Sequence, residues 1–350
     1  MRTLIAMSGG VDSAVCAHLV LAAGDAAEGC TLRLTDGETE RKTGSEDDIA
    51  RARETAAHLG IPHRVLDIRE DFRREVILPF CREYCAGRTP NPCVTCNRTV
   101  KFGRLYEEAR ALGFDRLATG HYARIAYEGG HYRLLKARDA AKDQSYVLYQ
   151  LTEEMLSHLL FPLGELTKEE VRAIAAARGL TVASQKESQD ICFVPNGRYA
   201  SLIEEVTGAV PPPGDYVDAE GRVLGRHRGI IHYTLGQHKG LGIALGRVRY
   251  VTGIDATRNT VTLGDEEDLY RSEVRVPQMH YIGERPERPF RAAVKLRYRQ
   301  AEEGATVYPE GEGARLVFDR PQRAPTAGQS AVLYDGDYVL GGGILTHSFS

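Results

Sequence analysis

Apolar residues in the first 120 positions follow two alternating patterns, namely short continuous runs and residues that recur every three or four positions. The runs predict strands and the recurring positions predict helices. The predicted strands cover residues 4–6, 28–34, 63–68 and 115–119, and the predicted helices begin after residue 10 and cover 46–59, 70–85 and 100–112. Such alternation is typical of a parallel sheet with helices on both faces and a ligand site beyond the carboxyl ends of its strands. We therefore predict an α/β fold with a doubly wound parallel sheet.

The pattern changes after the stretch from Pro211 to Gly214, which marks a linker or a tight corner. Helical spacing stops there, and residues 250–254 and 260–263 predict a hairpin. In roughly the last 80 residues apolar and polar positions alternate in short segments divided by turns, which indicates a small antiparallel β-barrel. We predict three domains: a nucleotide-binding catalytic domain (1–195), a small central β-rich domain (196–267) and a C-terminal β-barrel (268–350).

The first predicted strand leads into a glycine loop, which runs from Ala6 to Ser13 and is followed by a helix. Its two glycines allow backbone N–H groups to converge on an anion, its two serines add hydroxyl donors, and a helix N-terminus favours negative charge. The loop contains no Walker lysine, so it does not belong to the class that holds β- and γ-phosphates in P-loop proteins. We interpret it as a phosphate-binding loop of a different class.

Two cysteine-containing segments are candidates for thiol chemistry. Cys93 and Cys96 form a C-x-x-C in a segment with two prolines, which predicts an extended loop at the rim of the sheet. Because a helix N-terminus, Arg98 and Lys101 are near, we expect a lowered thiol pKa there. Cys192 lies in an apolar, strand-like run, where it is either a buried structural residue or a functional one.

The net charge of -3 excludes an overall basic protein, so nucleic-acid binding would need a local patch. The segment from Arg222 to Arg249 has six lysines and arginines and no acid, and we interpret it as a flexible basic region suited to a phosphate backbone. No apolar run approaches the ~18 residues of a membrane span. We see no signal peptide, and seven cysteines in such a chain indicate reduced thiols, so we expect a cytoplasmic protein.

Eight short motifs occur along the chain in this order: Ser8 to Ser13, Gly87 to Pro92 with Cys96, Ala118 to Tyr122, Lys142 to Tyr146, Ile191 to Phe193, Tyr233 to Gln237, Arg297 to Gln300, and Gly328 to Ala331. With these motifs the chain resembles, over nearly its whole length, the tRNA-specific 2-thiouridylases of the PP-loop ATP pyrophosphatase superfamily. The resemblance implies an adenine-nucleotide alpha-hydrolase-like first domain and a reaction in two steps. ATP, with Mg²⁺, adenylates the 2-carbonyl oxygen of the wobble uridine in a tRNA and releases pyrophosphate. Sulfur then replaces the oxygen, and AMP leaves.

The resemblance also implies roles for individual residues. The implied catalytic residues are Cys192, which would receive a persulfide from a sulfur-carrier protein, Cys96 as nucleophile or resolving thiol, and Asp12. Those implied to bind ATP are Ala6, Met7, Ser8, Gly9, Gly10, Val11, Asp12, Ser13, Leu32 and Gly120. Those implied to contact tRNA are Asn91, Pro92, Cys93, His121, Lys142, Asp143, Gln144, Arg297, Tyr298 and Gln329. The target base must leave its stack to be reached, which is easiest in an anticodon loop, and we expect the enzyme to be a monomer.

Cys93 stands where some members of this family have an aspartate with an acid–base role, and a thiol cannot do that work in the same way. Cys93, Cys96 and Cys192 could instead hold a [4Fe–4S] cluster with an open iron for sulfide. Cys81 and Cys85, together with the C-x-x-C, also allow a four-thiolate zinc site. Two other interpretations explain less of the sequence: another AMP-forming PP-loop ligase, such as an amidating synthetase, and an RNA- or metal-binding protein with an inactive loop. We favour the persulfide route over the cluster.

Overall fold

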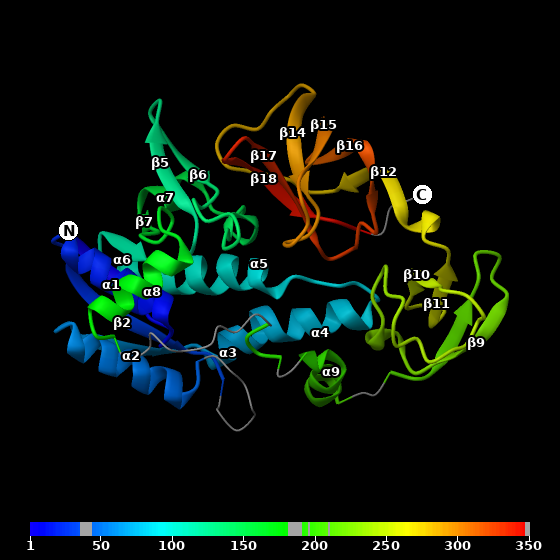
Figure 1. Cartoon of the computed structure of the whole chain (residues 1–350), viewed down its shortest axis with the longest axis horizontal. Coiled ribbons are helices and arrows are strands. Elements are labelled where there is room, and N and C mark those ends of the chain that lie inside the picture. The colour runs from blue at the N-terminus through cyan, green and yellow to red at the C-terminus, as the bar shows by residue number, and fades with distance from the viewer. Residues whose placement is uncertain (36–43, 181–190, 195–196, 209–210, 347–350) are drawn as a thin grey trace.

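The computed structural model describes residues 1–35, 44–180, 191–194, 197–208 and 211–346. Its first domain is built on a five-stranded sheet in the order β3-β2-β1-β4-β7, in which all neighbouring strands are parallel (Figure 1). The strands are β1 (Arg2–Ala6), β2 (Ala26–Arg33), β3 (His63–Asp67), β4 (Arg116–Ala118) and β7 (Leu159–Leu160). The predicted parallel α/β sheet is confirmed.

Successive residues of β1 pack into different cores, which explains why this strand reads as a continuous apolar run. Ile5 packs with Cys16 of α1 (Val11–Ala22) and Ala52 of α2 (Glu46–His58) on one face. Leu4 packs with Phe102 on the other face. Helices therefore cover both faces, as a parallel sheet requires.

Two long helical runs each contain a π-helical section. The first consists of α3 (Arg69–Phe72), the π-helix η1 (Arg73–Ile77) and α4 (Leu78–Cys85), and the second of α5 (Pro92–Cys96), the π-helix η2 (Asn97–Leu105) and α6 (Tyr106–Ala111). Pro79 follows the first π-helical section, and its missing N–H removes one bond from the regular helical ladder there.

The C-x-x-C lies on a helix, so the prediction of an extended loop for this segment is wrong. Pro92 occupies the first turn of α5, where its missing N–H costs nothing. The side chain of Asn91 caps the same helix by accepting a hydrogen bond from Cys93 N (3.1 Å). The second helical run therefore begins at Pro92 rather than at residue 100.

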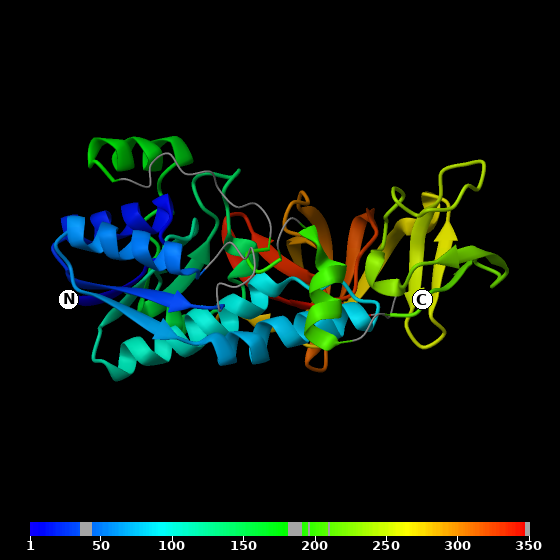
Figure 2. The same ribbon diagram turned by 90° about the horizontal axis from the view of Figure 1, so that it is seen from below.

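A central sheet follows, in the order β10-β11-β8-β9. Its strands are β8 (Gly214–Val217), β9 (Val223–His227), β10 (Tyr250–Asp255) and β11 (Thr260–Gly264), and β10 and β11 form the predicted hairpin. Helix α9 (Tyr199–Thr207) precedes this sheet, and Tyr199 stacks on Tyr84 of α4 with ring centroids 5.9 Å apart. Tyr216 of β8 packs in one apolar core with Phe80 and Tyr84, so the central sheet shares a core with the first domain. Figures 1 and 2 show the parallel sheet and the central sheet at opposite ends of the molecule.

The C-terminal sheet lies between these two ends, as Figures 1 and 2 show, and is antiparallel throughout. Its own strands are β12 (Tyr270–Val276), β13 (His280–Tyr281), β14 (Phe290–Lys295), β15 (Glu303–Glu310), β16 (Gly313–Arg323), β17 (Ser330–Asp335) and β18 (Tyr338–Ile344). The hairpin of β5 (Arg124–Glu128) and β6 (His131–Leu135), which belongs to the first domain, extends this sheet through the pair Tyr338 and Leu135. Strand pairing therefore ties the two domains together.

Shorter elements complete the fold: η3 (Ser145–Val147), α7 (Glu153–Ser157), α8 (Lys168–Ala177), η6 (Ile230–His232) and η7 (Glu267–Leu269). The motif from Lys142 to Tyr146 leads into a single 3₁₀ turn, η3. The strand-like run around Cys192 is a turn, in which Val194 N donates to Ile191 O (2.9 Å), so that prediction is wrong. Within the described ranges, no helix combines the length and the apolar character needed to cross a membrane.

Candidate active site

The glycine loop joins β1 to α1 at the carboxyl edge of the parallel sheet. Gly9 has φ +74°, and a Cβ there would collide with the backbone of Asp48 in the first turn of α2. Ser13 Oγ donates to Gly10 O (2.9 Å) and accepts from Ser8 N (3.2 Å), which closes the loop on itself. Gly10, the N-cap residue of α1, brings no side-chain cap. The N–H groups of this first turn are therefore open to an anion.

Two further residues that the resemblance assigns to ATP lie at the same edge. A Cβ on Gly120, which follows β4, would lie 3.0 Å from the carbonyl carbon of Asp12, so a larger residue there would force a small shift of this part of the loop. Leu32 lies near the carboxyl end of β2 and is half-buried against apolar side chains. The parallel strand order thus brings the loop, Leu32 and Gly120 together.

Asp12 is held by two side chains that sequence reasoning did not select. Lys168 Nζ donates to both carboxylate oxygens of Asp12, at 2.7 and 2.9 Å, and Tyr122 OH donates to Oδ1 at 2.7 Å. Lys168 is only 7% exposed. The sequence predicts the helix that Lys168 begins, because Thr167 and Glu170 form a capping box that the structure confirms. Nothing in the local pattern links that helix start to the loop.

Three thiols, those of Cys93, Cys96 and Cys192, lie close enough to Lys101 for its charge to act on each of them. The charge of each thiolate affects Cys192, and the ammonium of Lys101 acts on all three thiols. Cys96 and Cys192 also pack against the same apolar core. The fold therefore brings together thiols that are far apart in the sequence.

The prediction of a lowered thiol pKa is wrong. Burial raises the pKa of Cys96 to about 11 and that of Cys192 to about 12. Desolvation by the surrounding protein also raises the pKa of Cys93, even though part of its side chain reaches the surface. The positive charge of Lys101 acts in the opposite direction, but its effect is smaller than that of desolvation. All seven cysteines are free thiols in this conformation. Among the described residues, no group of three or more His, Cys, Asp or Glu side chains is arranged to hold a metal ion.

His121, assigned to tRNA by resemblance, is buried and has partners on both ring nitrogens. Lys101 Nζ donates to its Nε2 (3.3 Å), and its Nδ1 lies 2.7 Å from Thr119 Oγ1. Burial, assisted by the charge of Lys101, holds the pKa of His121 well below its usual value, so the ring is neutral. A neutral ring that accepts at Nε2 donates from Nδ1 to Thr119. His121 therefore positions Lys101 beside the thiols.

Several other residues assigned to tRNA form contacts within the protein. Gln329 Nε2 donates to Thr89 O (2.7 Å), and Arg297 Nη2 donates to Ala324 O (2.8 Å). Gln144 Oε1 accepts from Tyr122 N (2.9 Å). The remaining assigned residues comprise buried Pro92, exposed Cys93 and Tyr298, and half-buried Asn91, Lys142 and Asp143.

The basic segment from Arg222 to Arg249 is less positive than its sequence indicates. Arg222 pairs with Asp218, Arg226 with Asp215, and Arg247 and Arg249 both with Asp265. These acids lie just outside the segment, on neighbouring strands and turns. Four of its six cationic side chains are therefore compensated, and only Arg228 and Lys239 have no ion pair within the described ranges.

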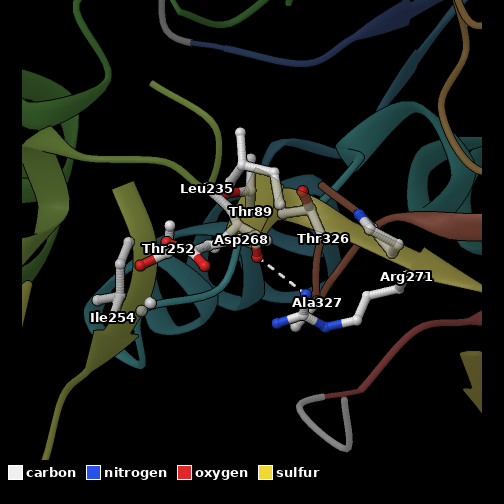
Figure 3. Close-up of a pocket in the computed structure, with 12 residues that line it drawn as sticks. Thr89, Leu235, Thr252, Ile254, Asp268, Arg271, Thr326 and Ala327 are labelled. Carbon is white, nitrogen blue, oxygen red and sulfur yellow. Dashed lines mark hydrogen bonds between the residues drawn. The ribbon is translucent and has the colours of Figure 1, made fainter. Parts of the chain in front are cut away.

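A cavity of about 180 Å³ lies where the three parts of the chain meet. Its walls include Thr89 from the first domain, Thr252 from the central sheet, and Asp268, Arg271 and Thr326 from the C-terminal part (Figure 3). None of the residues assigned to ATP, thiol chemistry or tRNA lines it. The cavity is therefore separate from the residues to which the resemblance assigns these roles.

Comparison with known proteins gives full-length relatives. Three family models match consecutive parts: a tRNA methyl transferase HUP domain (residues 1–196), a tRNA methyl transferase PRC-barrel domain (202–265) and an aminomethyltransferase beta-barrel domain (271–345). The tRNA-specific 2-thiouridylase MnmA of Acetivibrio thermocellus is 48% identical, over 98% of this chain and 99% of that protein. The protein of the same name from Moorella thermoacetica is 49% identical, over 98% of both. A solved complex of a 4-thiouridine synthetase with RNA and bound ATP is 19% identical over 59% of this chain and 50% of that one, with a TM-score of 0.39.

Proposed function

The chain belongs to the family of tRNA-specific 2-thiouridylases, which are tRNA sulfurtransferases, and we propose that it thiolates its tRNA by the persulfide route. Full-length similarity to this family argues against an amidating ligase and against a non-enzymatic RNA-binding protein. In the proposed reaction the substrates are ATP, a tRNA with a wobble uridine, and a sulfur atom delivered by a carrier protein. We expect the enzyme to work in the cytoplasm, where its thiols stay reduced.

The observation that carries the proposal is that thiols from two remote segments, Cys96 and Cys192, lie in one neighbourhood. A thiol with a pKa of about 12 forms almost no thiolate at neutral pH. Sulfur that arrives already activated, as a persulfide on Cys192, removes the need for that thiol to ionise. We favour this route over an iron–sulfur cluster or a zinc site on the same cysteines.

We propose that adenylation takes place on the glycine loop between β1 and α1. The 2-carbonyl oxygen of the uridine attacks the α-phosphorus of ATP, the bond to the β-phosphate breaks, and pyrophosphate leaves. The N–H groups at the start of α1 would hold the phosphates. Mg²⁺, when bound with ATP, would shield the charge of the pyrophosphate. Asp12, whose side chain is one-third exposed, offers the carboxylate oxygens that this hard cation prefers.

Sulfur transfer then uses the two thiols in different roles. The terminal sulfur of the persulfide on Cys192 attacks C2 of the adenylated uridine, and AMP leaves with the former carbonyl oxygen. The Cys96 thiol gives up its proton to the thiouridine product as its sulfur attacks the Cys192 sulfur. The bond between the Cys192 sulfur and the transferred sulfur breaks, and the electron pair of that bond goes to the new thiouridine. A disulfide between Cys96 and Cys192 remains, and a thiol reductant must open it before the next turnover.

The test compares Cys96→Ser and Cys192→Ser with Cys85→Ser, a control that removes an exposed thiol on α4. Thiouridine in the tRNA is measured by nucleoside mass spectrometry, and ATP binding by calorimetry. We expect both test variants to lose thiolation while ATP binding stays at the level of the control. Full thiolation by Cys192→Ser would exclude the persulfide route, and full thiolation by Cys96→Ser would remove that residue from the mechanism.

A further inference from the structure

The ion pair between Lys168 and Asp12 connects two elements that are far apart in the sequence. Lys168 is the first residue of α8, and Asp12 lies in the first turn of α1. The two helices share an apolar core that includes Val15 of α1 and Val171 of α8. The side-chain ammonium of Lys168 is buried, whereas the Asp12 side chain is 33% exposed. The lysine therefore reaches the glycine loop from inside the protein.

A phosphate-binding loop with an aspartate poses an electrostatic problem. The loop from Ala6 to Ser13 contains no cationic residue, and Asp12 adds a negative charge where ATP brings several more. Like charges at such short range repel strongly wherever protein replaces water. When no bound cation offsets that carboxylate, a charge within the protein must compensate it for the loop to accept a polyphosphate.

Given the ATP-binding role proposed above, we propose that Lys168 is a positioning residue that neutralises Asp12 and so allows the glycine loop to bind the phosphates of ATP. It does so through the carboxylate, because its Nζ donates to both Asp12 oxygens. The compensating charge lies on a helix that is distant in the sequence but adjacent in space, rather than in the loop itself.

The surroundings fix both partners of this ion pair. Tyr122 OH donates to Asp12 Oδ1, and the Lys168 ammonium lies 5.7 Å from the centre of the Tyr122 ring, within reach of a cation–π interaction. Gln144 holds the Tyr122 backbone twice, since its Oε1 accepts from Tyr122 N and its own N donates to Tyr122 O (2.8 Å). Asp139 Oδ2 accepts from Lys168 N (3.0 Å). Gln144, assigned to tRNA by resemblance, thus helps to shape the ATP site.

The experiment measures ATP binding by calorimetry, with Mg²⁺ and in EDTA, for Lys168→Met, for Asp12→Asn, and for the two combined. The control is Lys136→Met. Lys136 is a half-buried lysine that is likewise paired with a carboxylate, that of Glu302, and its ammonium lies 4.6 Å from the centre of the Tyr334 ring. Thermal melting of every variant separates loss of binding from loss of folding.

We expect Lys168→Met to weaken ATP binding by roughly tenfold or more, because an uncompensated charge near the phosphates costs about that much. Adding Asp12→Asn should restore most of the EDTA affinity, since it removes the charge that Lys168 compensates. Unchanged ATP affinity in Lys168→Met would overturn the proposal. So would a combined variant that binds as weakly as Lys168→Met, because Lys168 would then act on the phosphates directly. If the unaltered protein binds no ATP at all, the proposed function fails instead.

Discussion

Replacement of Gly9 by alanine tests the geometry of the glycine loop. Two effects oppose an alanine at this position. Its φ of +74° is strained for any residue with a Cβ, and the new methyl group would lie 3.1 Å from the carbonyl carbon and Cα of Asp48 and closer still to its oxygen. An alanine at Gly24 separates the two effects, because that position has a φ of +85° but open space where the Cβ would lie.

The structure gives an expected magnitude for each variant. Strain in the left-handed region costs about 1–2 kcal/mol, of which about 0.4–1 kcal/mol is offset because alanine restricts the unfolded chain. Gly24→Ala should therefore lower the free energy of unfolding by about 1 kcal/mol. Gly9→Ala adds an overlap with the backbone of α2, and overpacking of this kind costs about 1–3 kcal/mol more. We expect a total of about 2–4 kcal/mol for Gly9→Ala.

Thermal melting and ATP calorimetry on the two variants provide the assay. Gly9→Ala should melt at a clearly lower temperature than Gly24→Ala. It should also bind ATP at least about tenfold more weakly, because relief of the overlap shifts the loop against the first turn of α2 and turns its N–H groups away from the ligand. Gly24→Ala should bind ATP like the unaltered protein. Equal melting temperatures and equal ATP affinities in the two variants would refute this account of the loop.

Three further predictions concern thiols, pH and RNA. Burial raises the pKa of Cys96 to about 11 and that of Cys192 to about 12, so their alkylation by iodoacetamide should accelerate about tenfold per pH unit between pH 7 and 9. Peptide mass spectrometry measures the rate, and a rate that levels off in this range would contradict the raised pKa values. The folded-state pKa of His121 is depressed, so the unfolded chain binds the extra proton and stability falls as the pH drops below about 6.5. In a series of melts between pH 5 and 7, His121→Gln should lose part of that fall, and an unchanged pH profile would count against a neutral buried ring. Arg228 has no ion pair within the described ranges, whereas Arg226 is paired with Asp215. Arg228→Glu should therefore weaken tRNA binding, and reduce the salt dependence of that binding, more than Arg226→Glu. Filter binding at two salt concentrations compares the two variants, and equal effects would place the RNA contact elsewhere.

Local patterns were sufficient to predict much of the fold. Alternating apolar runs and helical periods predicted the parallel sheet, and the structure confirms it. The capping box at Thr167 and Glu170 and the hairpin of β10 and β11 are likewise confirmed. Each of these signals depends on residues within a few positions of one another, so the local pattern was enough to predict them.

The predictions from the sequence were wrong where the same local pattern is compatible with two different structures or environments. Two prolines near the C-x-x-C predicted an extended loop, but Pro92 opens a helix that Asn91 caps. Nearby positive charges predicted a lowered pKa for the thiols there, but burial, which sequence spacing does not report, has the larger effect. The basic segment lacked acids in sequence, yet strand pairing brings Asp215 onto Arg226.

The sequence by itself determined the alternation of strands and helices in the first domain, the glycine loop and the family. Only the tertiary structure decided which distant side chains meet: Lys168 with Asp12, and Cys192 with Cys96. The physical reason is that a local pattern encodes backbone conformation over one or two turns. The burial of a charge or a thiol depends on how all the elements pack together, and that packing sets both its partners and its pKa.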